Sequence, residues 1–162
     1  MFISRHATTH LALGLHVLGA VLLGGCGHGN GHDPWVVVTA AGPVRGTVDG
    51  GQRSFRGLPY AAPPVGPLRW AAPRPVEAWT VVRDATRFAT VCPQPVTDTT
   101  GRPAVLGNED CLYLNVDAPG VSDRPLPVLV FLHGGAFRNG GGSDYEAAAF
   151  SAKGRAVVVT VN

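Results

Sequence analysis

Residues 126–142 read LPVLVFLHGGAFRNGGG, and this stretch decides how the rest of the chain is interpreted. Its apolar part, 128–132, predicts a buried strand, and this strand ends abruptly in consecutive glycines. Glycines after a central strand leave backbone N–H groups that no ladder uses and no side chain covers, so these groups can point at a developing negative charge. The alternative is a tight glycine-rich turn with no chemical role.

The composition is that of a globular domain. The chain has 162 residues, of which 45% are hydrophobic and 15% charged, so it can form one domain with a core. Its formal net charge is only +2, and the basic residues are scattered without a run of Lys or Arg. We therefore expect no nucleic acid partner.

The first 25 residues have the pattern of an export signal. A short polar start containing Arg5 precedes the apolar run 11–23, which is too short to span a bilayer but suits the hydrophobic region of a secretory signal. Small residues then precede Cys26, which resembles a bacterial lipoprotein signal. We predict that 1–25 is a signal peptide, that Cys26 is lipidated, and that the protein is held on a membrane of the cell envelope. An ordinary cleaved signal and an uncleaved anchor are the alternatives.

Residues 26–33 form a glycine-rich segment that we expect to be a flexible tether between lipid and domain. His28 and His32 lie in it at a spacing that could bind a metal weakly. They have no fixed backbone and no further ligands, so we predict no metal site and no cofactor.

The chain after the tether begins with β-rich pieces and continues into a proline-rich segment. Residues 35–39 and 44–48 predict a hairpin, and 52–56 predicts a third strand. Prolines recur through 57–79, so neither a helix nor a central strand is expected there. Large apolar residues are interleaved with the prolines, which predicts that this arm, 57–79, lies against a surface.

The second half of the chain has the pattern of an α/β sheet. Strands are predicted at 112–117, 128–132 and 156–161. A helix is predicted over 144–153, with Ser143 or Asp144 as its cap and Gly154 at its end. A strand as apolar as 156–161 needs neighbours on both edges and layers on both faces, which predicts that the sheet is incomplete in these residues.

Three blocks of sequence are similar to those of one enzyme family. They read FRGLPYAAPPVGPLRWAAPRPVEAW at 55–79, NEDCLYLNV at 108–116 and VLVFLHGGAF at 128–137. In this order the blocks resemble the N-terminal third of the type-B carboxylesterase and cholinesterase family. The resemblance implies the α/β fold of that part of an α/β-hydrolase: a small antiparallel hairpin region, a proline-rich arm and the first strands of the central mixed sheet. We therefore expect 34–162 to be the N-terminal part of a carboxylesterase domain.

The same resemblance implies what the glycine loop does. By position in the family's motif, the backbone N–H groups of Gly135 and Ala136 match the donors of an oxyanion hole, and Gly134 matches the hinge that lets them turn inward. This HGGG-type loop is one half of the oxyanion hole in lipases and esterases. His133 precedes the donors, so we expect it to order the loop by hydrogen bonding and not to act as the catalytic base.

The catalytic triad of an α/β-hydrolase is not found in these residues. It needs a serine in G-x-S-x-G, then an acid, then a histidine. No serine present has glycine at both of these positions: Ser4, Ser54, Ser122, Ser143 and Ser151. The resemblance thus implies a fragment of an exported serine carboxylesterase that hydrolyses small-molecule esters through an acyl-enzyme and is inactive alone. A non-enzymatic cholinesterase-like binding domain and a truncated pseudogene-like product are the alternatives; the sequence indicates neither ester preference nor oligomeric state.

Two pairs of residues are expected to hold the domain together. Cys92 and Cys111 suggest a disulfide, because an exported chain with two cysteines left after lipidation usually pairs them. Free thiols and intermolecular pairing are the alternatives, and the resemblance implies the intramolecular bridge, worth about 3 kcal/mol by loop entropy. The resemblance also implies an ion pair of Arg69 with Glu109 that fixes the arm; the alternative for Arg69 is a solvated charge. If the pair is buried, removing one member would leave an uncompensated charge and be strongly destabilising.

Overall fold

The computed structural model describes residues 33, 35–120 and 122–162 of the chain. The predicted signal peptide, 1–25, and Cys26 lie outside the described residues. Of the predicted tether, 26–33, only Asp33 is described. Its carboxylate accepts a hydrogen bond from the Trp35 amide at 3.0 Å and lies 2.9 Å from the Arg45 guanidinium. The end of the predicted tether is therefore in contact with the domain.

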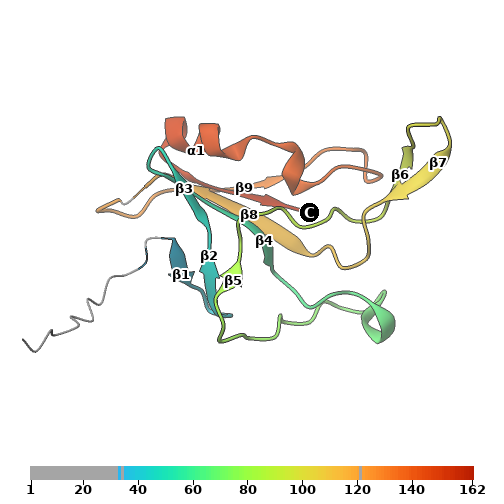
Figure 1. The fold of residues 1–162 in the computed structure, drawn as a ribbon, viewed down its shortest axis with the longest axis horizontal. Coiled ribbons are helices and arrows are strands. Elements are labelled where there is room, and N and C mark those ends of the chain that lie inside the picture. The colour runs from blue at the N-terminus through green and yellow to red at the C-terminus, as the bar shows by residue number, and fades with distance from the viewer. Residues whose placement is uncertain (1–32, 34, 121) are drawn as a thin grey trace, which may run out of the picture. The chain divides into compact units, whose positions relative to one another are not determined.

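The main sheet has five strands in the order β3-β4-β8-β10-β9 (Figure 1). Their bounds are Thr47–Asp49 for β3, Gln52–Pro59 for β4, Tyr113–Ala118 for β8, Val128–Leu132 for β9 and Val157–Val161 for β10. Strand β8 is antiparallel to β4 and β10, whereas β9 runs parallel to β10. This mixed sheet confirms the predicted fold class.

The chain crosses from β9 to the parallel strand β10 through a short turn and a helix. After β9 come a 3₁₀ turn, η2 (Gly142–Asp144), and helix α1 (Ala147–Gly154). Figure 1 shows α1 over one face of the main sheet, where it contacts β10, β8 and β4. The helix begins at Ala147 and not at the predicted position 144. The Asp144 carboxylate instead accepts a hydrogen bond from the Gly141 amide at 2.8 Å, which closes the 3₁₀ turn.

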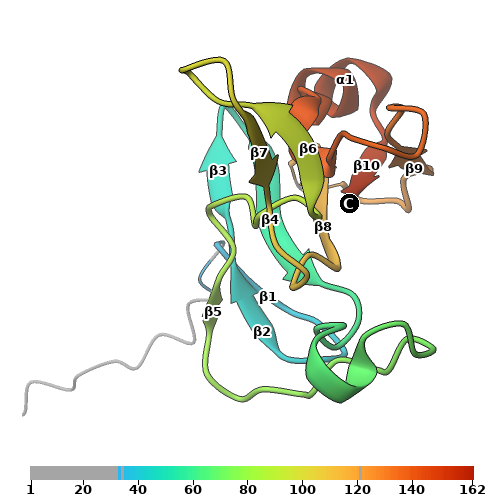
Figure 2. The same cartoon turned by 90° about the vertical axis from the view of Figure 1, so that its right-hand side faces the viewer.

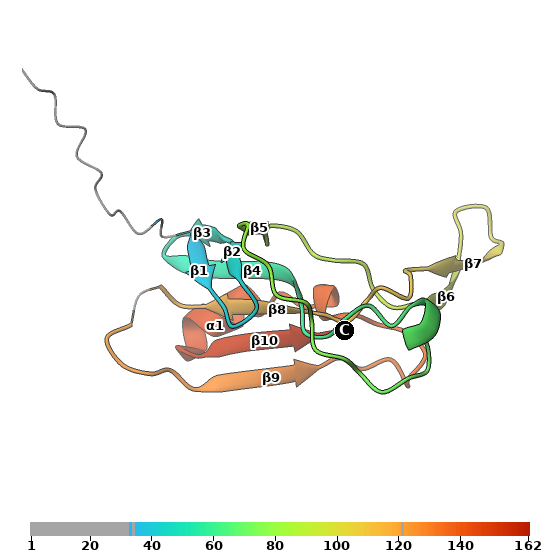
Figure 3. The same cartoon turned by 90° about the horizontal axis from the view of Figure 1, so that it is seen from below.

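Strand β9 is exposed, so the prediction that 128–132 is buried is wrong. Figure 3 shows β9 at the outer edge of the sheet, beside β10. The side chains of Val128, Val130 and Leu132 are 63%, 58% and 73% exposed. Among the described residues β9 pairs with β10 alone, so these apolar side chains have little to pack against. Strand β10, in contrast, has the neighbours that its sequence demands on both edges, namely β8 and β9.

A smaller sheet precedes the main one. It consists of β1 (Val36–Val38), β2 (Pro43–Arg45) and β5 (Arg83–Asp84) in the order β1-β2-β5 (Figure 2). The antiparallel pairing of β1 with β2 confirms the predicted hairpin. The second predicted run, 44–48, is however divided at Gly46, after which β3 joins the main sheet. The run therefore belongs to two sheets and not to one strand.

The apolar core of this region lies where the small sheet meets β4. Val44, Phe55 and Ala85 are buried there, and Trp79 packs against them. The Trp79 indole Nε1 donates a hydrogen bond to the Pro43 carbonyl at 2.9 Å. Trp79 is thus a residue by which the end of the proline-rich arm is attached to the domain.

The proline-rich arm departs from its predicted form at its start. Strand β4 continues to Pro59, and after a register shift Leu58 and Pro59 pair with Leu114 and Tyr113 of β8. A proline is tolerated here because β3 pairs with β4 only over 52–54, so the other edge of β4 needs no N–H donor at Pro59. Strand β4 thus extends into the first three residues of 57–79, but there it has β8 as its partner on one edge alone among the described strands, so this part is not a central strand.

The middle of the arm is more exposed than predicted. A 3₁₀ turn, η1 (Gly66–Leu68), is followed by Trp70, whose side chain is 91% exposed and whose φ is 62°. Tyr60 and Val65 are also about two-fifths exposed, at 41% and 42%. The prediction that the apolar residues of the arm lie against a surface is therefore wrong for Trp70, whereas Tyr60 and Val65 are partly covered.

A buried ion pair lies between β4 and β8, and no motif in the sequence indicated it. The Asp117 carboxylate is fully buried and lies 2.6 Å from the guanidinium of Arg56 and 2.6 Å from the Ser54 hydroxyl. The Arg56 guanidinium also stacks 4.6 Å from the centroid of the Phe88 ring. On the helix side, the Ser151 hydroxyl donates to the Asp117 carbonyl at 3.1 Å. These contacts tie β4, β8 and α1 together.

The segment between the two paired cysteines forms a ribbon of its own. Strands β6 (Gln94–Thr97) and β7 (Pro103–Leu106) pair only with each other, in antiparallel register. Figure 1 shows this ribbon projecting beyond one end of the main sheet. No helix in the described part of the chain is both long enough and apolar enough to cross a membrane.

Candidate active site

The loop after β9 is ordered by its own backbone and by two side chains. Its Gly135 carbonyl accepts hydrogen bonds from the amides of Arg138, at 3.0 Å, and Asn139, at 3.3 Å. The His133 Nδ1 lies 2.7 Å from the Gly134 carbonyl oxygen, and the Gly134 amide donates to the Tyr145 hydroxyl at 3.4 Å. The glycine-rich loop that the sequence predicted after this strand is thus a turn closed by backbone hydrogen bonds.

Three consecutive amides of this turn, those of Gly135, Ala136 and Phe137, are left without a partner among the described residues. Among the described residues, the N–H groups of Gly135 and Ala136 donate no hydrogen bond, whereas the Gly134 amide is used by Tyr145. Both residues are exposed, so water can satisfy these donors until another acceptor arrives. Of the three predicted oxyanion-hole residues, the structure therefore leaves free the two that were matched to the donors.

The backbone of the turn is strained. Gly135 has a φ of 127°, and the two residues after it, Ala136 and Phe137, have left-handed φ values of 55° and 59°. Left-handed conformation in a residue with a side chain costs of order 1 kcal/mol and persists where the surroundings enforce it, commonly at functional sites. The orientation of these free amides is therefore imposed by the turn.

A cavity of about 250 Å³ lies beside the turn. It is lined by residues of the turn, of the disulfide region and of the end of β10: Cys92, Pro93, Gln94, His133, Phe137, Arg138, Asn139, Gly140 and Asn162. A larger cavity of about 410 Å³ lies between α1 and strands β9 and β10, but its lining is almost entirely apolar. We place the candidate site at the smaller cavity, because its lining includes His133 and Phe137, which flank the glycine turn on either side.

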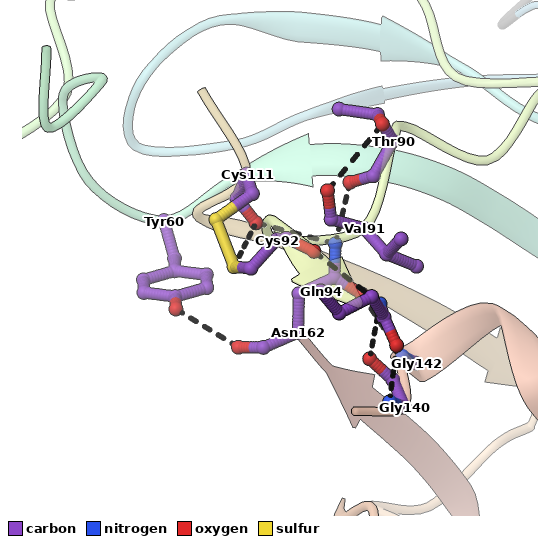
Figure 4. The surroundings of a disulfide bond; sticks show 9 residues. All are labelled: Tyr60, Thr90, Val91, Cys92, Gln94, Cys111, Gly140, Gly142 and Asn162. Atoms are coloured by element: carbon purple, nitrogen blue, oxygen red, sulfur yellow. Dashed lines mark hydrogen bonds between the residues drawn. A yellow bond between two sulfur atoms is a disulfide. The ribbon is translucent and has the colours of Figure 1, made fainter. Parts of the chain in front are cut away.

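Two side chains far apart in sequence hold the glycines that follow the turn, and sequence reasoning missed both (Figure 4). The Gln94 side chain bonds to both backbone groups of Gly140. The Asn162 Oδ1 accepts a hydrogen bond from the Gly142 amide at 2.9 Å, and its Nδ2 donates to the Thr90 carbonyl at 2.9 Å. Neither residue belongs to a catalytic residue type or motif, so no local signal could have identified it.

Asn162 also connects the site to the proline-rich arm. The Tyr60 hydroxyl donates a hydrogen bond to the Asn162 carbonyl at 3.1 Å. Burial raises the pKa of the Tyr60 phenol, so the hydroxyl remains a donor at neutral pH and above. The first residue after β4 therefore contacts the end of β10.

The structure joins Cys92 and Cys111 in a disulfide, with their Cα atoms 5.0 Å apart (Figure 4). The Cys111 carbonyl accepts a hydrogen bond from the Asn162 Nδ2 at 3.2 Å. The bridge therefore closes the ribbon at its base and lies next to the residues that hold the glycines.

Arg69 and Glu109 form an ion pair, but it is exposed to solvent. The two side chains are 55% and 37% exposed. The strong destabilisation expected for a buried pair therefore does not apply. Exposed ion pairs contribute little to the free energy of unfolding. Water screens the attraction, and two long side chains must be ordered to form the pair.

Replacing Arg69 with Ala should change the free energy of unfolding by less than about 1 kcal/mol. Urea unfolding of the oxidised 162-residue chain measures this change, and Glu109→Gln should give a similarly small one. A loss of about 3 kcal/mol or more for either variant would mean that the pair is desolvated in solution.

The described residues contain no cluster of three or more His, Cys, Asp or Glu side chains suited to a metal ion. His28 and His32 lie outside the described residues.

The mixed sheet with its crossover and the free amides after β9 define a class of protein, the α/β-hydrolases, and comparison with known proteins identifies the family. Residues 33–162 match the model of the carboxylesterase family, so the chain belongs to this family. It is 44% identical over 131 residues to the para-nitrobenzyl esterase of Bacillus subtilis, which covers 78% of this chain and 27% of that protein. It is 42% identical to the phenmedipham hydrolase of Pseudarthrobacter oxydans, covering 76% of this chain and 27% of that one.

Solved structures agree with this assignment. A thermophilic para-nitrobenzyl esterase superimposes with a TM-score of 0.72 at 44% identity, covering 80% of this chain and 28% of that structure. A carboxylesterase of Geobacillus stearothermophilus superimposes with a TM-score of 0.70 at 42% identity, covering 79% and 26%. The chain thus spans about a quarter of the length of these relatives.

Proposed function

We propose that this chain supplies the oxyanion-hole part of an exported serine carboxylesterase that acts on small-molecule esters. The observation that carries the proposal is the pair of free amides at Gly135 and Ala136, held in a strained turn at the end of β9. The family membership supports ester hydrolysis as the reaction of the whole enzyme.

The chemistry expected of such an enzyme needs donors where these amides lie. A serine Oγ attacks the ester carbonyl, the carbonyl oxygen becomes negatively charged, and the alcohol leaves to give an acyl-enzyme that water hydrolyses. The Gly135 and Ala136 N–H groups would bind the negative oxygen. One such donor is typically worth about 3 to 4 kcal/mol of barrier height.

Two of the serines that the structure describes, Ser54 and Ser151, have other partners, which supports the interpretation that the nucleophile lies elsewhere. The Ser54 hydroxyl donates to Asp117, and the Ser151 hydroxyl donates to the Asp117 and Ala156 carbonyls. Neither lies in a G-x-S-x-G sequence. Both have structural roles.

The 162-residue chain alone should show no turnover of a chromogenic short-chain ester such as p-nitrophenyl acetate. The reason is that an oxyanion hole without a nucleophile and its base forms no acyl-enzyme. Release of p-nitrophenolate is followed by its visible absorbance, and the heat-denatured chain is the control. A burst of one product per chain, followed by steady turnover, would contradict this expectation.

A hybrid enzyme tests the proposal directly. We define it as the Bacillus subtilis para-nitrobenzyl esterase in which the matching N-terminal segment is replaced by residues 33–162 of this chain. If this chain carries a working oxyanion hole, the hybrid should hydrolyse p-nitrophenyl acetate. The unmodified relative is assayed in parallel as the reference. A hybrid that folds, as judged by circular dichroism and melting, but has no activity would favour the non-enzymatic alternative.

The proposal of export with a lipid anchor at Cys26 is supported by the apolar run before that residue and by the disulfide, since disulfides persist in oxidising compartments. In a bacterial host, the parent chain should fractionate with membranes and carry a lipid mass at its N-terminus. Cys26→Ser should lose both, because serine has no thiol to acylate. His28→Ala, which leaves the thiol, is the control. A parent chain without lipid mass would contradict the proposal.

A further inference from the structure

The Gln94 side chain forms hydrogen bonds with backbone groups beside the candidate site. Its Oε1 accepts from the Gly140 amide at 2.7 Å, and its Nε2 donates to the Gly140 carbonyl at 3.2 Å and to the Cys92 carbonyl at 3.3 Å. Gln94 is only 8% exposed, so its side-chain amide is largely removed from water, and these hydrogen bonds replace the ones that water would make. One side chain thus holds both backbone groups of one glycine that lies 46 residues away.

Gly140 in turn packs against the start of the oxyanion loop. Its φ is 112°, and an added Cβ would lie 2.5 Å from the His133 Nδ1 and 2.7 Å from the Gly134 carbonyl oxygen. Gly140 therefore fills the space behind the two residues that precede the free amides. Any displacement of Gly140 changes the support of His133 and Gly134.

Gln94 lies on the ribbon and not in the main sheet. It is the first residue of β6, which pairs only with β7, and it follows the disulfide cysteine Cys92 by two positions. The contact therefore joins two exposed segments, the ribbon and the loop. Losing it should move the loop without removing a strand or opening the apolar core.

We propose that Gln94 is a positioning residue for the oxyanion loop, acting through Gly140 on His133 and Gly134 and so on the free amides of Gly135 and Ala136. This inference rests on the proposed function for its effect on catalysis. The structural part, that Gln94 sets the conformation of the loop, can be tested without it.

The structural test uses nuclear magnetic resonance on the oxidised 162-residue chain with the variants Gln94→Met and Gln94→Glu. Met keeps the volume but loses the hydrogen bonds, so the Gly140 amide should exchange about tenfold faster. The amide resonances of Gly134, Gly135 and Ala136 should shift in that variant. Glu keeps an acceptor for the Gly140 amide, so it should restore most of its protection.

The chain offers a matched control in its other glutamine. The Gln52 Nε2 donates to the Ser151 hydroxyl at 3.0 Å, under the helix. Gln52→Met should therefore perturb resonances of α1 and leave those of Gly134, Gly135 and Ala136 in place. If Gln94→Met accelerates Gly140 exchange but leaves the three loop resonances unchanged, the positioning role is overturned.

The catalytic test uses the hybrid enzyme. Misplaced donors lower the rate of chemistry, so Gln94→Met should reduce kcat by about 100-fold with little change in KM, and Gln94→Glu should recover part of it. An active hybrid that loses activity with Gly135→Ala but keeps its kcat with Gln94→Met would overturn the inference and leave the proposed function intact. An inactive hybrid would count against the proposed function, and the resonance shifts would then decide the role of Gln94.

Discussion

Replacing Gly135 with Ala should lower the kcat of the hybrid enzyme by about 100- to 1,000-fold, the cost of losing one oxyanion donor. An added Cβ would lie 1.7 Å from the Asn139 carbonyl oxygen, which no relaxation of a flexible side chain can relieve, because that atom belongs to the backbone. The φ of 127° is also one that alanine rarely adopts. The turn must therefore open, and the free amides lose their imposed direction.

The neighbouring positions supply matched controls for this prediction. A Cβ added at Gly134 meets no atom within 4 Å, so Gly134→Ala should fold with the same turn. Ala136→Gly removes a side chain from a left-handed residue and keeps the backbone donor, so it should be active and slightly more stable. If Gly135→Ala retains the activity of these controls, the turn is not the oxyanion hole.

Replacing Arg56 with Met should lower the free energy of unfolding of the 162-residue chain by about 3 to 5 kcal/mol. The Asp117 carboxylate is fully buried, and without the guanidinium it loses its charged partner and keeps its hydrogen bond from the Ser54 hydroxyl. A buried charge left without its counter-ion loses its hydration and gains little in return. Urea unfolding of the oxidised chain, followed by tryptophan fluorescence, measures the change.

Two further variants distinguish a lost ion pair from lost packing. Arg56→Met combined with Asp117→Leu removes both charges, and it should recover much of the stability because apolar replacements of a buried pair are often tolerated. Arg69→Ala breaks an exposed pair and should cost far less. A double variant that is as unstable as Arg56→Met would show that the arginine acts through its stacking on Phe88 and not through its charge.

Most of the secondary structure could be predicted because it follows from local pattern. The valine-rich run of β10 and the alternation of β8 were predicted to within one residue of their observed bounds. The crossover from β9 through α1 follows from a helix-forming run between two apolar runs. The start of α1 was misplaced because Asp144 caps a 3₁₀ turn, a choice that depends on its bond to Gly141.

Burial was predicted less well, because it depends on what covers an element. The apolar sequence of β9 is compatible with a core strand, yet Val128 and Leu132 are exposed since β9 lies at the edge of the sheet. The same error was made for Trp70 in the arm and for the pair of Arg69 with Glu109. Residue type indicates a preference for burial, but whether a side chain is buried depends on the elements that pack over it.

By itself, the sequence determined the family, the fold class and the position of the glycine loop, because these depend on residue types that are adjacent in the chain. Only the tertiary structure decided which amides of the loop are free, that Gln94 and Asn162 hold its glycines, and that the buried charge is Asp117 and not Glu109. The reason is that these contacts join residues 20 to 61 positions apart, and no local pattern encodes such a distance.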